Sequence, residues 1–344
     1  MHWEPWHLDL RIPAKENCYC AIAPDGKRFL LSSEGSVSIH DAVYGARTLT
    51  IPAKCRTAFF SPNGRWVVTL GSDTDDNAVW DSHTGVRKLV LRTLGKGYLT
   101  SWVVDFSPDC TAICAPLNGL NQSVEFSEAS EFKIYDIQTG VSMPITGSKG
   151  SLVRFLPGAK QILFASGANA CVRDLATGVV LSTMQHEHRV MAAAFIPGNR
   201  LVTGDDQRLY LWNLADKSLL KRSEGCRAFD LLVSTDGSSI QALEYDGSIY
   251  RECFNAPDLS FSAGYVLPGC DYLCGHSFNA EHNRFISGNS EDGVTIFTMC
   301  HPEYWWGVAW LPEFWLTAFF AGAFAWSIWK DRRDARFKTA KLLA

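Results

Sequence analysis

Apolar and polar positions alternate in short blocks along the first 300 residues, and one block recurs. It is clearest in residues 59–85, where an apolar pair precedes Ser-Pro-Asn-Gly and the run Trp66–Leu70 leads through a polar loop to Trp80-Asp81. Runs of this length, rich in β-branched and aromatic residues, favour β-strands. Pro fixes φ and Gly accepts positive φ, so the connecting segments predict tight turns. The block therefore predicts strand, turn, strand, loop, strand and turn.

The block occurs in seven copies of unequal quality. Successive openings are 38, 46, 49, 40, 38 and 45 residues apart, which is the period of a four-stranded propeller blade. The copies resemble the WD40 repeat over roughly residues 5–300, most clearly in the second and fifth copies. This resemblance implies an all-β, seven-bladed β-propeller with four-stranded antiparallel blades. The openings are at Pro24, Pro62, Pro108, Pro157, Pro197, Thr235 and Ala280.

The N-terminal stretch supplies a strand that the seventh copy lacks. Residues 7–15 parallel residues 47–54, and both contain Ile-Pro-Ala-Lys. Since the second stretch is the expected outer strand of the first blade, the first stretch should be an outer strand too. We expect it to pair into the last blade, which would close the ring and remove two open sheet edges.

The composition changes after Met299. Residues 310–329 form a twenty-residue apolar span with one charge, which is long enough for a helix to cross a bilayer. Tryptophans flank it at both ends, as at membrane interfaces. A helix docked on the propeller, or in an oligomer core, is the alternative. The expected organisation is a propeller in 1–300, an aromatic linker in 301–309, a transmembrane α-helix in 310–329 and a short basic tail in 330–344. The expected anchor residues are Trp310, Phe314, Trp315, Phe319, Phe320, Phe324, Trp326 and Trp329.

Two signals disagree on orientation. The basic tail favours a cytoplasmic C-terminus, whereas an N-terminus without a basic start and apolar run favours a cytoplasmic propeller. Eleven cysteines without regular spacing suit a reducing compartment. We expect a single-pass C-terminal anchor with the propeller in the cytoplasm. Small residues at Ala318-x3-Gly322 and Ala321-x3-Ala325 would allow a homodimer through the membrane helix.

The fifth copy carries the fuller WD40 signature. The resemblance implies that His186, Thr203, Asp206 and Trp212 form a structural hydrogen-bonded group that ties loops to the blade. The neighbouring His186-Glu187-His188-Arg189 is interpreted as a solvated loop rather than a metal site. Cys270-x3-Cys274-x-His276 fits no common zinc spacing, so we expect neither metal nor cofactor.

Basic residues recur where each inner strand should begin. In a propeller the loops between second and third strands, and the connections between blades, lie on one face, here called the top; the Pro-Asp-Gly and Trp-Asp turns lie on the bottom. The expected top-face cations are Lys15, Lys54, Lys149, Arg189 and Arg227. Glu125, Glu128 and Glu131 fall in an insertion of the third copy that could cover them.

These features favour a scaffold over an enzyme. The net charge of −4 argues against nucleic-acid binding by bulk charge. No nucleophile–base pair or phosphate-binding loop stands out in the sequence. The WD40 resemblance implies protein or peptide partners, and the cations suggest an acidic one. The alternative is a propeller enzyme, or a sensor of small ligands or anions, that uses the central channel.

Overall fold

The chain divides into two compact units, Met1–Met299 and Cys300–Ala344. The structure, a computed structural model, describes residues 6–13, 19–33, 35–55, 57–71, 77–92, 104–117, 129–223, 225–234, 236–245, 249–267, 276–279, 281, 283–289 and 293–299. Lys15, Glu125, Glu128 and the pair Cys270 and Cys274 lie outside these residues, as do the aromatic linker, the expected anchor and the tail. Within the described part of the chain, no helix is long and apolar enough to span a bilayer.

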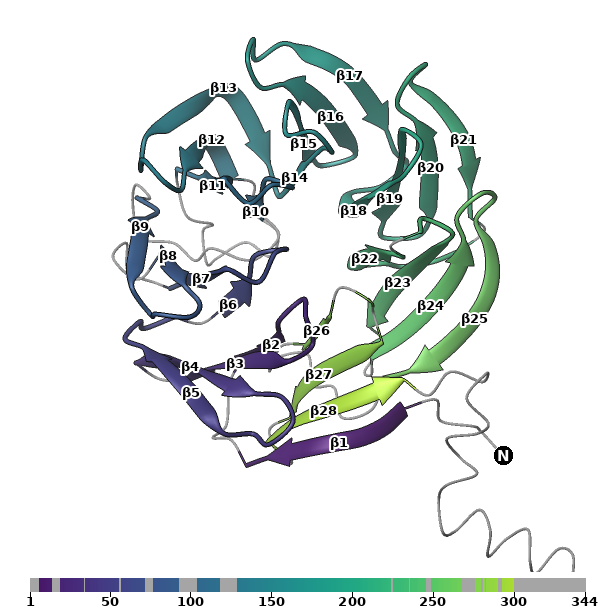
Figure 1. Cartoon of the computed structure of the whole chain (residues 1–344). Coiled ribbons are helices and arrows are strands. Elements are labelled where there is room, and N and C mark those ends of the chain that lie inside the picture. Colours follow the sequence, from purple (N-terminus) through teal and green to yellow (C-terminus); the bar gives the residue numbers. More distant parts are fainter. Residues whose placement is uncertain are drawn as a thin grey trace, which may run out of the picture. The chain divides into compact units, whose positions relative to one another are not determined.

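The described strands form seven four-stranded antiparallel sheets, arranged as blades around a ring in Figure 1. This confirms the seven-bladed propeller expected from the repeats. The first blade consists of β2 (Tyr19–Ile22), β3 (Arg28–Ser33), β4 (Ser36–Asp41) and β5 (Arg47–Ile51). The second consists of β6 (Thr57–Phe60), β7 (Trp66–Leu70), β8 (Ala78–Asp81) and β9 (Arg87–Val90).

The next three blades follow the same order from the inner to the outer strand. The third has β10 (Asp105–Phe106), β11 (Ala112–Pro116), β12 (Ala129–Asp136) and β13 (Ser142–Gly150). The fourth has β14 (Leu152–Phe155), β15 (Gln161–Ser166), β16 (Asn169–Asp174) and β17 (Val180–Gln185). The fifth has β18 (Val190–Ile196), β19 (Arg200–Asp205), β20 (Leu209–Asn213) and β21 (Ser218–Arg222).

The last two blades differ in how they are completed. The sixth has β22 (Asp230–Val233), β23 (Ser239–Tyr245), β24 (Ile249–Asn255) and β25 (Ser260–Val266). The seventh has β26 (His276–Phe278), β27 (Arg284–Asn289), β28 (Gly293–Met299) and, as its outer strand, β1 (Trp6–Ile12).

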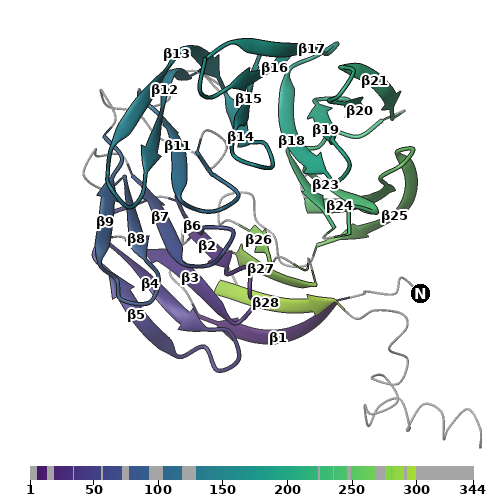
Figure 2. The same cartoon turned by 45° about the horizontal axis from the view of Figure 1, so that its top comes forward.

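Strand β1 closes the ring. It pairs antiparallel with β28 from Trp6↔Met299 to Ile12↔Val294, and the two strands lie side by side in Figures 1 and 2. The expectation drawn from the repeated Ile-Pro-Ala-Lys is confirmed: β5 ends at Ile51 and β1 at Ile12. Closure gives β28 a partner on both sides, so the last blade has its four strands.

Neighbouring blades share their hydrophobic cores. Leu30 and Ile39 of the first blade belong to the same buried cluster as Val67 and Trp80 of the second. Strand β7 is buried at all of its positions, because both faces of a middle strand pack against adjacent blades. The core therefore lies between the sheets all around the ring.

Hydrogen bonds between turns fix the bottom face. Arg28 of β3 donates to the Gly64 carbonyl of the next blade over 3.0 Å, and Trp66 Nε1 donates to the Cys110 carbonyl over 3.2 Å. Arg284 of β27 likewise donates to the Gly26 carbonyl across the closure. Since each residue begins a second strand and reaches a turn of the next blade, these turns lie on one face.

Candidate interaction site on the fifth blade

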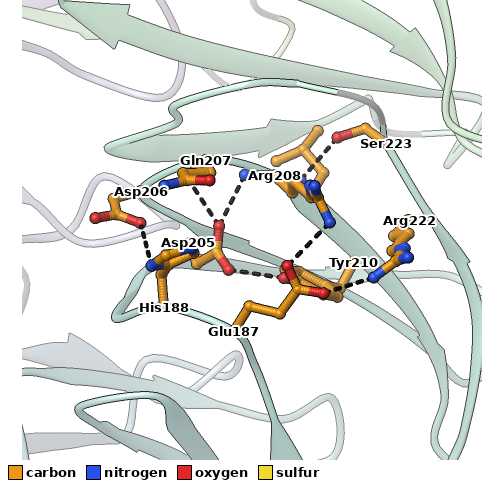
Figure 3. A network of polar contacts seen from close by, with 10 residues as sticks. Glu187, His188, Asp205, Asp206, Gln207, Arg208, Tyr210, Arg222 and Ser223 are labelled. Carbon is orange, nitrogen blue, oxygen red and sulfur yellow. Dashed lines mark hydrogen bonds and ion pairs between the residues drawn. The ribbon is translucent and has the colours of Figure 1, made fainter.

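The top of the fifth blade combines three segments. Residues 186–189 connect β17 to β18, residues 206–208 connect β19 to β20, and β21 ends nearby at Arg222. In a strand, alternate side chains share a face, so Thr203 and Asp205 of β19 point the same way. Figure 3 shows the charged side chains that these segments bring together.

A buried hydroxyl ties the blade to its entering loop. Thr203 Oγ1 lies 2.7 Å from His186 Nε2 and accepts a hydrogen bond from Trp212 Nε1 over 2.8 Å. The indole N–H donates to the hydroxyl oxygen, and the imidazole tautomer sets the direction of the bond between Thr203 Oγ1 and His186 Nε2. The structure thus brings together three of the four residues expected in the hydrogen-bonded group.

The fourth expected member, Asp206, makes no hydrogen bond to this group among the described contacts. The neighbouring Asp205 is the buried carboxylate, and it reaches the group through its partner Tyr210, whose ring lies edge-on to that of His186 at 4.7 Å. Asp205 is fully buried, and its carboxylate accepts from Tyr210 Oη over 2.8 Å and from the Arg208 backbone N–H over 2.8 Å. It also accepts from the Gln207 backbone N–H over 2.9 Å. Asp206 follows the end of β19, so its side chain leaves the buried face and lies 3.7 Å from His188 Nδ1 instead.

Burial sets the protonation of this group. Burial lowers the pKa of His186, which keeps the imidazole neutral while it is hydrogen-bonded to Thr203. Burial and the hydrogen bond to Asp205 raise the pKa of Tyr210 to about 12, so the phenol remains a donor. Both sets of hydrogen bonds, His186–Thr203–Trp212 and Tyr210–Asp205, are therefore retained near neutral pH.

Above these buried hydrogen-bonded residues lies a surface ion-pair network that the sequence did not reveal. Glu187 bridges two arginines: Arg208 Nη1 lies 3.0 Å from its Oε2, and Arg222 Nη1 lies 2.6 Å from its Oε1 (Figure 3). The three side chains come from three segments, two of them 35 residues apart. The only signal was the high density of charge in residues 186–189 and 205–208. The loop interpreted as solvated is thus partly ordered by ion pairs.

The expected cations fall into different environments. Lys54 and Arg227 are exposed in connections between blades, and the Arg227 backbone N–H donates to Glu244 over 2.6 Å. Arg189 is half-buried directly before β18 and has an interaction of its own. Lys54 and Arg227 therefore remain as exposed top-face cations near the start of inner strands.

Two positions in the third blade need correction. Lys149 lies in outer strand β13, opposite Ser130, and does not begin an inner strand. Strand β13 extends this far because its register shifts between Ser130 and Phe132, and Ser148 Oγ accepts the Phe132 N–H over 2.7 Å. Glu131 lies in strand β12, so it is not part of the inserted loop.

One group of described residues has donors that could meet at a metal ion. The donor atoms of Cys226, Glu244 and Glu252 lie within 4.8 Å of one another. Burial and the hydrogen bond to Glu244 raise the pKa of the Cys226 thiol, and burial and the Glu244 charge raise that of Glu252. Zinc would need the thiolate, so the surroundings favour a hydrogen-bonded thiol.

A small pocket lies on the bottom face between the fourth and fifth blades. Its volume is about 210 Å³, and its lining includes Pro157, Pro197, Arg200 and Leu214. Turn residues form it, so it does not belong to the top-face site.

Comparisons with known proteins agree with this architecture. A family model described as WD domain, G-beta repeat, matches residues 178–213, which include the His186–Thr203–Trp212 group. No curated protein matches the chain. The β-propeller domain of Myceliophteria thermophila Cps50 (Swd1) is similar, with a TM-score of 0.63 and 12% identity over 86% of this chain and 100% of that one. The C-terminal WD40 domain of Sif2 has a TM-score of 0.56 and 16% identity, covering 82% of this chain and 81% of that one.

These identities show the fold alone. The repeat match and the structural neighbours nevertheless point in the same direction as the seven blades and the fifth-blade hydrogen bonds. The chain folds as a seven-bladed β-propeller, and the segment that matches the WD repeat spans the junction of its fourth and fifth blades.

Proposed function

We propose that this chain is a membrane-tethered scaffold that binds an acidic segment of a protein partner through the top of its fifth blade. WD40 propellers generally bind protein partners. The observation that carries the proposal is that Glu187 holds Arg208 and Arg222 above the buried hydrogen-bonded residues of the fifth blade. These buried residues hold the charged groups in place before a partner arrives, which reduces the entropy lost on binding.

The arginines retain donors for a partner. A guanidinium has five N–H donors, and the Glu187 contacts use one from Arg208 and one from Arg222. The Arg222 side chain is 54% exposed, so a partner can reach it. A carboxylate or phosphate on a partner could accept from the remaining N–H donors in bidentate geometry.

Exposed cations elsewhere on the top face support an acidic partner. Lys54 lies between the first and second blades, and Arg227 lies between the fifth and sixth. These charges would steer an acidic segment to the top although the whole chain has a net charge of −4.

The tether in the proposal is the span of residues 310–329. This twenty-residue span carries one charge and has tryptophan at both ends, so it has the length and the flanks of a membrane helix. The cysteines with free thiols, among them Cys20, Cys114 and Cys226, support a propeller in the reducing cytoplasm. Homodimerisation through the small residues of the span is part of this proposal, and cross-linking of the purified chain in micelles tests it.

Partner capture from detergent-solubilised membranes tests the scaffold function. The variant Lys54→Glu/Arg222→Glu/Arg227→Glu should capture far less of the acidic partner, and the residual binding should depend less on salt. A matched control, Lys27→Glu/Arg65→Glu/Lys160→Glu, changes the same charge at exposed bottom turns. Equal capture by the two variants would contradict a top-face site.

Carbonate washing tests the tether separately. Full-length chain should stay in the membrane pellet after the wash, while a chain that ends at Met299 should be released. Full-length chain in the supernatant would mean that residues 310–329 do not cross the bilayer.

A further inference from the structure

The exposed hydrophobic side chains are gathered on one part of the propeller. Eleven large hydrophobic side chains among the described residues are exposed. Each lies in the turn before an outer strand or within the first three residues of that strand. They are Leu8, Val43, Tyr44, Val86, Val141, Met143, Val179, Val180, Leu219, Leu220 and Phe261. We call this set the bottom rim, because outer strands begin at the bottom face.

The same register position is apolar and exposed in three successive blades. Val86, Val141 and Val179 each follow the glycine of the outer turn, and they are 62%, 62% and 57% exposed. Tyr44, at the equivalent turn of the first blade, is 83% exposed. Single exposed hydrophobics are ordinary, but a repeated position on one rim makes a larger apolar surface.

The outer strand of the fifth blade is apolar near its bottom end and basic near its top end. Strand β21 reads Ser-Leu-Leu-Lys-Arg from bottom to top, so Leu219 and Leu220 precede Lys221 and Arg222. All four side chains are exposed. The apolar surface therefore belongs to the bottom end of this strand and not to its whole length.

Contacts between blades fix the outer turns at two of the blade junctions. A Cβ added at Gly85 would lie 3.2 Å from Leu49 Cδ1 of the preceding blade, so this turn packs directly on that outer strand. Lys217, in the outer turn of the fifth blade, donates to the Leu181 carbonyl of the fourth. Neighbouring turns are thus held at fixed positions relative to one another.

The chain leaves the propeller at this rim. Met299 ends β28 opposite Trp6, the first residue of outer strand β1, which places both at the bottom. The apolar span begins at Trp310. The ten intervening residues could extend about 35 Å at most, so an inserted span would keep the bottom face close to the bilayer.

We infer that the bottom rim docks on the lipid bilayer, with its valines, leucines and aromatic residues in the interfacial layer. This inference rests on the proposed tether, which supplies the local concentration of membrane. Weak apolar contacts become effective once tethered, because the second contact is then intramolecular. Aromatic and aliphatic side chains at the same depth suit the lipid interface. The docked propeller would present its top face to the aqueous phase.

Photo-crosslinking of the full chain in phosphatidylcholine vesicles tests the docking. Benzoylphenylalanine replaces Val141 or Val179 on the rim, and replaces exposed Gln207 on the top face as the control. After irradiation, mass spectrometry should find lipid adducts severalfold more abundant at positions 141 and 179 than at 207. Equal yields at the three positions in vesicle-bound protein would overturn the docking while leaving the tether intact.

Two other outcomes would also overturn it. Crosslinks from position 141 or 179 to a second copy of the chain, or to residues 310–329, in place of lipid would assign the rim a protein occupant. Failure of the full chain to float with the vesicles would overturn the tether and the docking together. A rim variant, Val86→Ser/Val141→Ser/Val179→Ser, should reduce lipid adducts at a benzoylphenylalanine placed at Phe261. Unchanged adducts there in the folded variant would contradict a shared docking surface.

Discussion

The second and fifth blades share one hydrogen bond and differ in what surrounds it. Trp80 Nε1 donates to Thr69 Oγ1 over 2.9 Å in the second blade, as Trp212 donates to Thr203 over 2.8 Å in the fifth. Two residues after Thr69 stands Gly71, whose N–H donates to Asn77 Oδ1 over 2.8 Å. The fifth blade has a buried aspartate at the corresponding place.

The difference shows how a repeated fold acquires a local site. In the second blade a neutral amide closes the end of the strand pair. In the fifth blade Asp205 holds two loop N–H groups and a phenol, and His186 adds the entering loop. The shared Trp–Thr bond stabilises the blade, while the added groups fix the loop that carries Glu187 and Arg208.

Removal of the buried carboxylate should have the largest effect. Asp205→Ala leaves the Tyr210 hydroxyl and two backbone N–H groups without their acceptor, so we expect a loss of about 3–5 kcal/mol in the free energy of unfolding. Denaturant titration measures it, with Asp206→Ala as the control that should change stability by less than about 0.5 kcal/mol. Similar losses in the two variants would contradict the assignment of Asp205.

Loss of the threonine hydroxyl should destabilise the protein more when it is removed from the fifth blade than from the second. Thr203→Val removes a hydroxyl with two side-chain partners, His186 and Trp212. The hydroxyl lost in Thr69→Val has one side-chain partner, Trp80, and a longer bond of 3.4 Å to the Ala78 carbonyl. We expect a loss of about 2–3 kcal/mol for Thr203→Val and about 1–2 kcal/mol for Thr69→Val. Denaturant titrations of the two variants give the comparison, and a larger loss at Thr69 would reverse it.

Acid should weaken the fifth blade before the second. The pKa of His186 is lowered in the folded state by burial, so between that value and about 6.5 the unfolded chain binds more protons than the folded one. The stabilisation is present above about pH 6.5 and decreases as the pH falls below it. Hydrogen exchange of the Gln207 and Arg208 amides should therefore become faster at pH 5.5 than at pH 7.5, after correction for intrinsic rates. Equal acceleration at Gly71 would show a general effect of acid.

Neutralisation of the surface bridge should have the smallest effect on stability. Glu187→Gln removes the charge between Arg208 and Arg222, which are partly exposed. Since exposed pairs contribute about 0–1 kcal/mol, we expect unfolding to change within that range. Partner binding should change more than stability does, which surface plasmon resonance at low and high salt would measure.

Much of the fold followed from the sequence because turns and strands repeat. The shared Ile-Pro-Ala-Lys located the closing strand β1 correctly. Asp205 could also have been chosen over Asp206, because Thr203 and Asp205 are two residues apart and must share a strand face. Asp206 was predicted from its spacing in the WD40 pattern alone, without regard to this alternation of side chains.

The surface site could not be derived in the same way. The Glu187 bridge joins segments whose distance depends on how one blade packs on the next. The prediction that Lys149 begins an inner strand was wrong, because β13 has a register shift and extends past Lys149. No residue type in that stretch indicates such a shift. Local sequence rules say little about where exposed charged side chains meet, whereas the side chains of buried strands alternate with a strict period of two residues.

The closing pair of strands also determines when the propeller can be completed during synthesis. Trp6 leaves the ribosome almost 300 residues before its partner Met299. Until then β1 has no sheet to join, and the unfinished ring has open edges that can aggregate. Pairing of such distant segments slows folding because the intervening chain must first be ordered. A chaperone that covers β1 until Met299 is synthesised would therefore protect the nascent chain during this interval.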